Sequence, residues 1–228
     1  MPSLVQHAIR FTGTSTDHIQ GVFSSSNTAG NLLLTVLVIP ANRPPILFTD
    51  SQGNSYSGAP AVFHITPNQT MYTYYTPNCI GGTAVNTITA SLASSVATLD
   101  MWVGEISGLS QVSPFDLSTS TTGSSGTVNS PATGNVGTPR DFLIATVACT
   151  TATGIGAGAG WTLADTIPAV GSGRLAVAYT TAIAITTYTS TYSLAGAENF
   201  LTQVVAFKPD PGAVGPGASV NNCLWLGI

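Results

Sequence analysis

The stretch Leu32-Leu33-Leu34-Thr35-Val36-Leu37-Val38-Ile39 is almost entirely apolar, and it lies between Gly30-Asn31 and Pro40. It is far shorter than the ~20 residues that a membrane helix needs. A short apolar run between Gly, Asn and Pro residues favours a β-strand that is covered on both faces. Phe142–Cys149 is a second run of this kind. The sequence therefore predicts two buried central strands, and around them an all-β fold.

The surroundings of these two runs are similar to each other and follow in the same order. Asn31 before the first run corresponds to Asp141 before the second, 110 residues later. Further matches pair Gly58-Ala59-Pro60-Ala61 with Thr166-Ile167-Pro168-Ala169, Tyr75 with Tyr179, Thr87–Leu92 with Thr189–Leu194, and Leu99–Val103 with Leu201–Val205. The separation shrinks from 110 to 102 residues, as shorter loops in a second copy would cause. We therefore predict two sequence repeats, about 1–109 and 110–209.

Two arrangements of such repeats are open. Each repeat is its own seven-strand sandwich, or the two are pseudo-symmetric halves of one antiparallel β-sandwich of jelly-roll type. We favour the single sandwich, spanning residues 1–209, because no more than five or six of the candidate strands in either repeat are well defined. Residues 118–126, rich in Ser, Thr and Gly, are either a linker or a counterpart of Gly13-Thr14-Ser15-Thr16, which precedes a strand.

Strand patterns occur along most of the chain, as short apolar or alternating runs between turn residues. In the first repeat they are Val5–Phe11, His18–Phe23, Leu32–Ile39, Ile46–Phe48, Ala61–Ile65, Thr70–Thr76, Asn86–Leu92 and Thr98–Ile106. In the second they are Phe142–Cys149, Arg174–Thr181, Thr186–Ser193 and Phe200–Phe207.

Charge is scarce in this chain. Only 6% of the 228 residues are charged, against about 25% in an average domain, and the net charge is −4. No cluster of Lys or Arg is present, so nucleic-acid binding and electrostatic membrane binding are not expected. The first ten residues lack a signal-peptide pattern, and no run is long enough for membrane insertion. An uncharged polar surface suits a protein on a virion or at a cell surface.

No catalytic constellation is visible, and we expect no enzyme activity, no cofactor and no metal. The histidines His7, His18 and His64 lack ligand spacing. Glu105 lies in an apolar stretch and is expected to be a buried, hydrogen-bonded acid. Residues 49–54 are interpreted as a turn rather than a calcium loop, and 154–160 as a glycine-rich hairpin connection. Of three cysteines, free thiols are favoured over one disulfide.

Aromatic residues suggest an alternative function as an extracellular carbohydrate-binding module. Sugar stacking would use exposed rings chosen from Tyr72, Tyr74, Tyr75, Trp102, Trp161, Tyr188 and Tyr192. Aromatic residues in a sandwich are more often part of the core. We therefore keep glycans as the second class of partner.

After Lys208 the sequence changes character. Residues 210–228 form a Pro/Gly connector that ends in an apolar tail. A solvated tail gains nothing from large apolar side chains, so we predict that this tail docks, either on its own sandwich or, in the leading hypothesis, on a neighbouring subunit. The docking residues would be Leu224, Trp225, Leu226 and Ile228.

Several turn and strand motifs resemble a loose group of uncharacterised β-sandwich proteins of bacterial surfaces and tailed-phage particles. The resemblance spans about residues 4–209. It is carried by Gly30-Asn31-Leu32-Leu33, residues 49–56, Tyr74-Tyr75, residues 105–109, Gly160-Trp161-Thr162 and Ala206-Phe207-Lys208. It implies surface display or capsid decoration. The leading expectation is thus a structural or decoration protein that contacts neighbouring subunits, either its own copies or a host lattice such as a capsid.

Overall fold

The computed structural model describes residues 1–40, 42–64, 68–149, 154–166 and 174–212, and these residues form strands, turns and loops without any helix. The all-β prediction is therefore confirmed. In the first half the strands are β1 (Ser3–Thr12), β2 (Thr16–Val22), β3 (Leu32–Pro40), β4 (Leu47–Asp50), β5 (Ser57–Gly58), β6 (Val62–His64), β7 (Gln69–Thr76), β8 (Thr87–Val96) and β9 (Leu99–Ser107). In the second they are β10 (Phe115–Asn129), β11 (Phe142–Cys149), β12 (Gly156–Ala157), β13 (Thr162–Thr166), β14 (Arg174–Thr181) and β15 (Thr191–Phe207).

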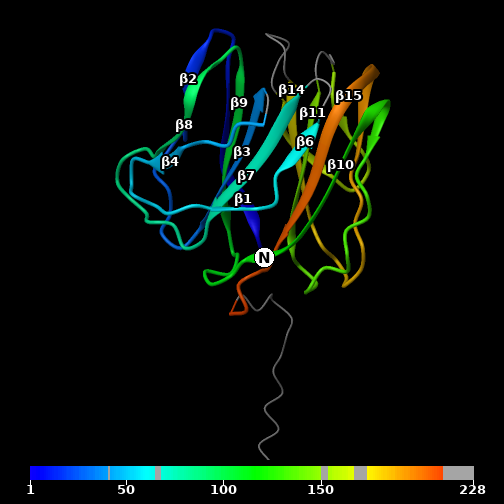
Figure 1. Ribbon diagram of the computed structural model, residues 1–228. Coiled ribbons are helices and arrows are strands. Elements are labelled where there is room, and N and C mark those ends of the chain that lie inside the picture. Colours follow the sequence, from blue (N-terminus) through cyan, green and yellow to red (C-terminus); the bar gives the residue numbers. More distant parts are fainter. Residues whose placement is uncertain (41, 65–67, 150–153, 167–173, 213–228) are drawn as a thin grey trace, which may run out of the picture.

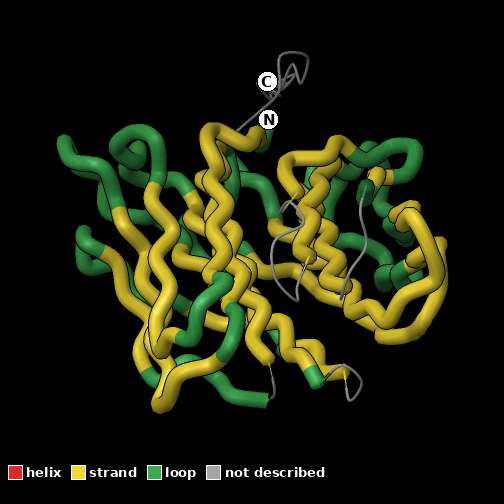
Figure 2. Tube along the Cα trace, turned by 90° about the horizontal axis from the view of Figure 1, so that it is seen from above, coloured by secondary structure: helices red, strands yellow, loops and turns green. Residues whose placement is uncertain are grey.

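The strands form three antiparallel sheets, each drawn from one half of the chain. Sheet 1 has the order β1-β9-β3-β7-β5, with β6 also paired to β7. Sheet 2 has the order β10-β15-β11-β14-β13, with β12 also paired to β15. A small third sheet, β2-β8-β4, belongs to the first half. The two halves stand side by side, as Figures 1 and 2 show.

Sheets 1 and 2 have the same order of strand pairing. In each, the first strand of the half pairs with the last, the last pairs with the apolar central strand, and the central strand pairs with the next long one. A duplicated half would produce this order. The repeat and the jelly-roll type themselves stay predictions.

The central strands β3 and β11 are buried on both faces, as their sequences predicted. In β3, Leu34 and Val36 belong to a core between the two sheets, whereas Leu33 and Leu37 belong to a core between sheet 1 and the small sheet. In β11, Ile144 faces the shared core and Val147 faces a third core on the other side of sheet 2. Because successive side chains of a strand point to opposite faces, each central strand contributes to two cores.

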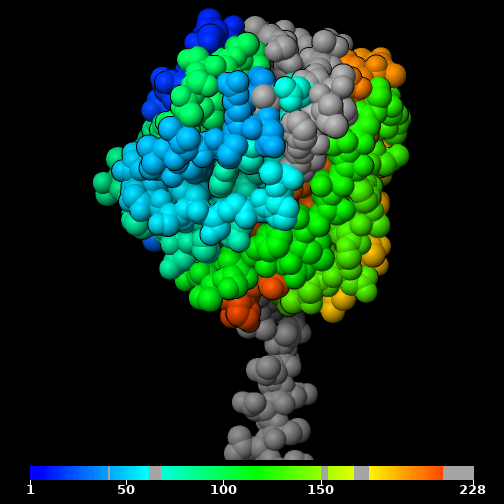
Figure 3. Space-filling model, in the orientation of Figure 1, coloured from blue at the N-terminus to red at the C-terminus, as the bar shows by residue number. Residues whose placement is uncertain are grey.

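The shared core joins the halves into one sandwich-like block (Figure 3). It is built from Leu32, Leu34, Val36, Val38, Met71, Trp102, Ile106 and Leu109 of the first half and from Phe142, Ile144, Ala148, Leu175, Val177, Leu201, Val205 and Phe207 of the second. Each half therefore contributes one face to an apolar layer that neither half completes alone.

Sequence reasoning is wrong at two places in the second half. Residues 118–126, for which a linker and a segment preceding a strand were both left open, lie inside the long strand β10, which pairs along β15. Ser and Thr fit a pleated surface well enough to form this strand where a partner strand is present. The separate runs predicted at Thr186–Ser193 and Phe200–Phe207 are also wrong in detail, since residues 186–190 are loop and β15 continues from Thr191 to Phe207.

Candidate functional site

The predicted docking residues Leu224, Trp225, Leu226 and Ile228 lie outside the described residues, which end at Gly212. The connector that leads to them is fixed at one end of the block, here called the base, which also holds the N-terminus (Figure 1). The Lys208 amide donates to the Pro114 carbonyl at 2.7 Å, and the Asp210 amide donates to the Gly108 carbonyl at 2.9 Å. These bonds hold the start of the connector beside the loop that joins the halves.

A cavity of about 510 Å³ opens at the base. It is lined by Ser110, Val112, Ser113, Thr138, Pro139, Arg140, Lys208, Pro209, Asp210 and Pro211. Ser113 and Arg140 have positive φ angles of 54° and 86°. Backbone in this region is strained for residues with a side chain, and such strain is found most often at binding sites and switch regions. The base cavity is therefore one of two candidate sites.

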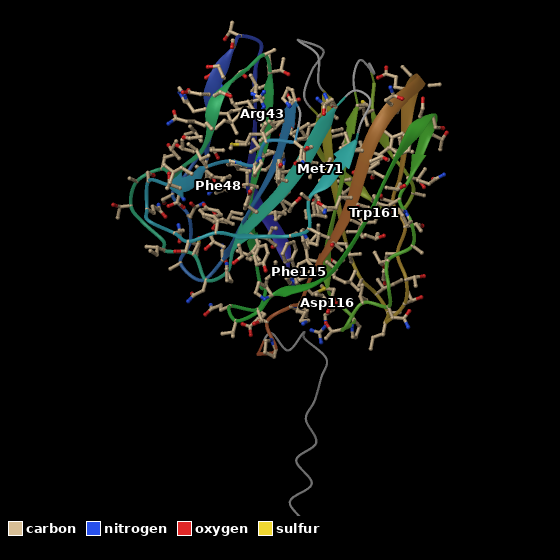
Figure 4. All side chains as sticks on the ribbon, viewed as in Figure 1. Arg43, Phe48, Met71, Phe115, Asp116 and Trp161 are labelled. Carbon is tan, nitrogen blue, oxygen red and sulfur yellow. The ribbon has the colours of Figure 1, made fainter. Side chains whose placement is uncertain are left out.

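Two carboxyl groups, Asp116 and Asp141, lie beside this cavity, with Asp116 visible near the base in Figure 4. The Thr138 hydroxyl donates to Asp141 Oδ1 at 2.5 Å, while the buried Oδ2 accepts no hydrogen bond. Asp116 accepts from the Gly137 amide at 2.6 Å and lies 3.6 Å from the Lys208 ammonium. Burial and the Asp116 carboxylate raise the pKa of Asp141 to about 6. Asp141 therefore holds its proton at pH values where an exposed aspartate is already ionised.

The second candidate site is a pocket of about 420 Å³ in the second half. It is lined by Ala159, Gly160, Trp161, Thr180, Thr181, Ile183, Thr187, Tyr188 and Thr189. Trp161 and Tyr188 are half-buried and pack against the outer core of sheet 2. We call this hollow the Trp161–Tyr188 pocket.

The other aromatic residues proposed for sugar stacking are mostly core residues. Trp102 and Tyr192 are fully buried, and Tyr72 is 8% exposed. Tyr74 stacks on Phe48 with ring centroids 4.6 Å apart, and Tyr75 packs against the shared core. Among the rings that the sequence suggested, Trp161 and Tyr188 are thus the two that line a described pocket together.

Glu105 is a structural anchor, as its apolar surroundings predicted. Its carboxylate accepts hydrogen bonds from the side chains of Gln6, Asn27 and Asn31 and from the Thr28 amide, at 2.6 to 2.8 Å. Burial raises the pKa of Glu105, but these four donors outweigh that effect, so its pKa lies below the ordinary value. The carboxylate holds the loop before β3 against β9, and all its close partners are protein donors.

The stretch 49–54 contains a turn, as predicted, at residues 51–52 directly after β4. Asp50 Oδ1 accepts from the amides of Gln52 and Asn54, and Oδ2 accepts from the Tyr56 hydroxyl at 2.8 Å and from the Asn86 side chain at 2.9 Å. Because donors surround the carboxylate, its oxygens are used within the protein. Within the described residues, no group of three or more His, Cys, Asp or Glu side chains has the arrangement of a metal site.

Sequence reasoning missed the polar contacts between the halves, and one of them involves His7. His7 Nδ1 on β1 lies 3.1 Å from Asp165 Oδ2 on β13, and the His7 ring stacks on Trp102. The partners are 158 residues apart, so no local motif marks them. Cys79 and Cys149 are buried thiols that are not joined by a disulfide, as favoured, while Cys223 lies outside the described residues.

Comparisons with known proteins give this chain no family: no family model, curated protein or solved structure matches it. The described part of the chain also contains no helix with the length and apolar character needed to cross a membrane.

Proposed function

We propose that this protein is a structural or decoration protein of a virion or cell-surface assembly, and that it contacts neighbouring subunits through its base and through residues 213–228. The observation that carries the proposal is the anchoring of the connector. Backbone hydrogen bonds at Lys208 and Asp210 fix the chain at the start of the connector. A tail whose attachment point is held in place loses less conformational entropy on docking than a tail on a free linker.

The base has further features of an interface. Met1 is 77% exposed and Val112 is 81% exposed, and Val112 lies at the rim of the base cavity with Pro139, Pro209 and Pro211. Large apolar side chains gathered beside a cavity are typical of a surface that another protein covers. Scarce charge on the chain also suits close packing of many subunits, because little like-charge repulsion opposes it.

Deletion of residues 213–228 tests the proposal. All described hydrogen bonds of Lys208 and Asp210 stay in the shortened chain, so the sandwich is expected to keep its far-UV circular dichroism and its unfolding midpoint. The full chain is expected to form oligomers in light scattering, and the deletion variant is expected to be a monomer. In the full-length chain, Leu224→Ser combined with Trp225→Ser should have the same effect, whereas Ile46→Ser, at a residue that is 68% exposed, should have none.

A monomeric full chain at all concentrations would contradict the assembly proposal as it applies to copies of this chain. Oligomers that persist after the deletion would place the contact elsewhere on the sandwich.

A further inference from the structure

The two rings of the Trp161–Tyr188 pocket are held in place by their polar atoms. Trp161 Nε1 donates to the Thr189 carbonyl at 2.9 Å. The Tyr188 hydroxyl accepts from the Ile183 amide at 2.9 Å and donates to the Ala184 carbonyl at 3.1 Å. Because these polar groups are already bonded to backbone, what each ring offers the pocket is its apolar surface in a fixed orientation. Fixed rings lose little freedom when a ligand binds.

The remaining lining is neutral and rich in hydroxyl groups. Thr180, Thr181, Thr187 and Thr189 contribute side-chain hydroxyls, and no charged residue is among the lining residues. Thr187 and Thr189 are exposed. Threonine hydroxyls both donate and accept hydrogen bonds. Such a lining selects an uncharged ligand that carries both hydroxyl groups and an apolar face.

We propose that the Trp161–Tyr188 pocket binds one sugar unit of a neutral glycan. A pyranose ring has an apolar C–H face and a rim of hydroxyl groups, which match an aromatic ring bordered by threonines. The C–H groups carry slight positive charge and are attracted to the negative face of an aromatic ring. The pocket volume of about 420 Å³ lies within the range usual for small-molecule sites.

The proposal is independent of the assembly through the base, because it uses other residues. Ile183, at the pocket rim, is 91% exposed and would add an apolar contact for the sugar or for a neighbouring unit of the glycan. A glycan site on one surface and a protein contact at the base would allow an assembled protein to hold a glycan-coated surface.

Isothermal titration calorimetry of the full-length protein tests this site. The probes are the neutral tetrasaccharides maltotetraose, cellotetraose, mannotetraose and chitotetraose, with tetragalacturonate as a charged comparison. We expect at least one neutral probe to bind with a Kd below about 1 mM, and tetragalacturonate to bind at least tenfold more weakly. Trp161→Ala is expected to weaken binding by at least tenfold.

A second variant keeps the test valid if Trp161→Ala disturbs the core that it packs against. Thr187→Val keeps the shape of an exposed side chain and removes its hydroxyl, and it should weaken binding about threefold to tenfold. Thr122→Val makes the same change at an exposed residue of β10 outside the pocket, and its binding should equal that of the unchanged protein.

Three results would overturn the proposal: no binding of any neutral probe, tighter binding of the charged probe, or full binding by both pocket variants. Loss of oligomers in the Ile183→Ser variant, without glycan binding by the unchanged protein, would instead identify this surface as a protein contact.

Discussion

At the scale of single residues, Asp141 is the side chain with the clearest chemical consequence. Its sequence position, before an apolar strand, matches that of Asn31 in the first half. Asn31 donates a hydrogen bond to Glu105, whereas Asp141 meets a second acid, Asp116. The two halves therefore stabilise a buried carboxyl group in different ways. Glu105 in the first half is ionised and accepts hydrogen bonds, whereas Asp141 in the second half keeps its proton up to a higher pH.

The raised pKa of Asp141 predicts a pH-dependent stability. Between its ordinary pKa of 3.8 and its folded value of about 6, the folded state holds a proton that the unfolded chain has released. The contribution of Asp141 to stability is therefore greatest below about pH 4 and is lost as the pH rises through 6. Asp141→Asn removes this titration and keeps an N–H donor for Asp116. At pH 7 we expect the variant to be more stable by about 1–2 kcal/mol.

Urea unfolding of both proteins from pH 4 to pH 7 measures this effect. The difference between them isolates Asp141, because carboxylates with lowered pKa values, such as Glu105 and Asp50, act in the opposite direction in both proteins. A difference that stays constant across this range would show that Asp141 is ionised throughout.

At the scale of elements, strand β15 connects the most parts of the second half. It pairs with β10, β11 and β12, and its buried Gln203 reaches across to the first half. The Gln203 side chain accepts from the Thr73 hydroxyl at 2.7 Å and donates to the Pro60 carbonyl at 2.6 Å. The Gln203 side chain thus forms two hydrogen bonds between the halves, next to the apolar shared core.

Replacing Gln203 should therefore destabilise the protein by more than the loss of its packing. Gln203→Ala leaves the Thr73 hydroxyl and the Pro60 carbonyl without these partners, which costs about 1–3 kcal/mol on top of the cavity. Gln20→Ala is the matched control, because Gln20 is exposed on β2 and its change is expected to stay within about 0.5 kcal/mol. Equal unfolding free energies for the two variants would show that the Gln203 hydrogen bonds do not stabilise the packing of the sheets.

At the scale of the whole molecule, the shared core makes the two halves dependent on each other. Trp102, Leu34 and Val36 from one half contact the same apolar layer as Phe142 and Ile144 from the other. Separation would expose this layer to water at about 25 cal/mol per Å² of apolar surface. The halves are also joined at their edge by His7 and Asp165.

The protein is therefore expected to unfold in one cooperative step. In the Trp161→Phe/Trp225→Phe background, Trp102 fluorescence reports on the first half, while far-UV circular dichroism reports on all strands. Urea titrations followed by both signals should give the same midpoint. A second circular dichroism step without a fluorescence change would instead mean that the halves fold as separate domains.

The sequence alone determined the fold class and the central strands, because an apolar run of eight residues between turn signals has few other ways to be buried. It also determined that Glu105 is a hydrogen-bonded, buried acid and that a turn lies within residues 49–54, since both depend on local surroundings. The position of β10 was not visible, because a Ser/Thr-rich segment becomes a strand only when a partner such as β15 is beside it.

Only the tertiary structure brought together the residues of the candidate sites. Trp161 and Tyr188 lie 27 positions apart and look like ordinary core aromatics until the loop after β14 is placed beside the turn before β13. Asp116 and Asp141, like His7 and Asp165, meet through sheet pairing and packing between segments that are distant in the chain. Periodicity encodes which face of a strand is buried, whereas the side chains that share a pocket are decided by how the sheets pack.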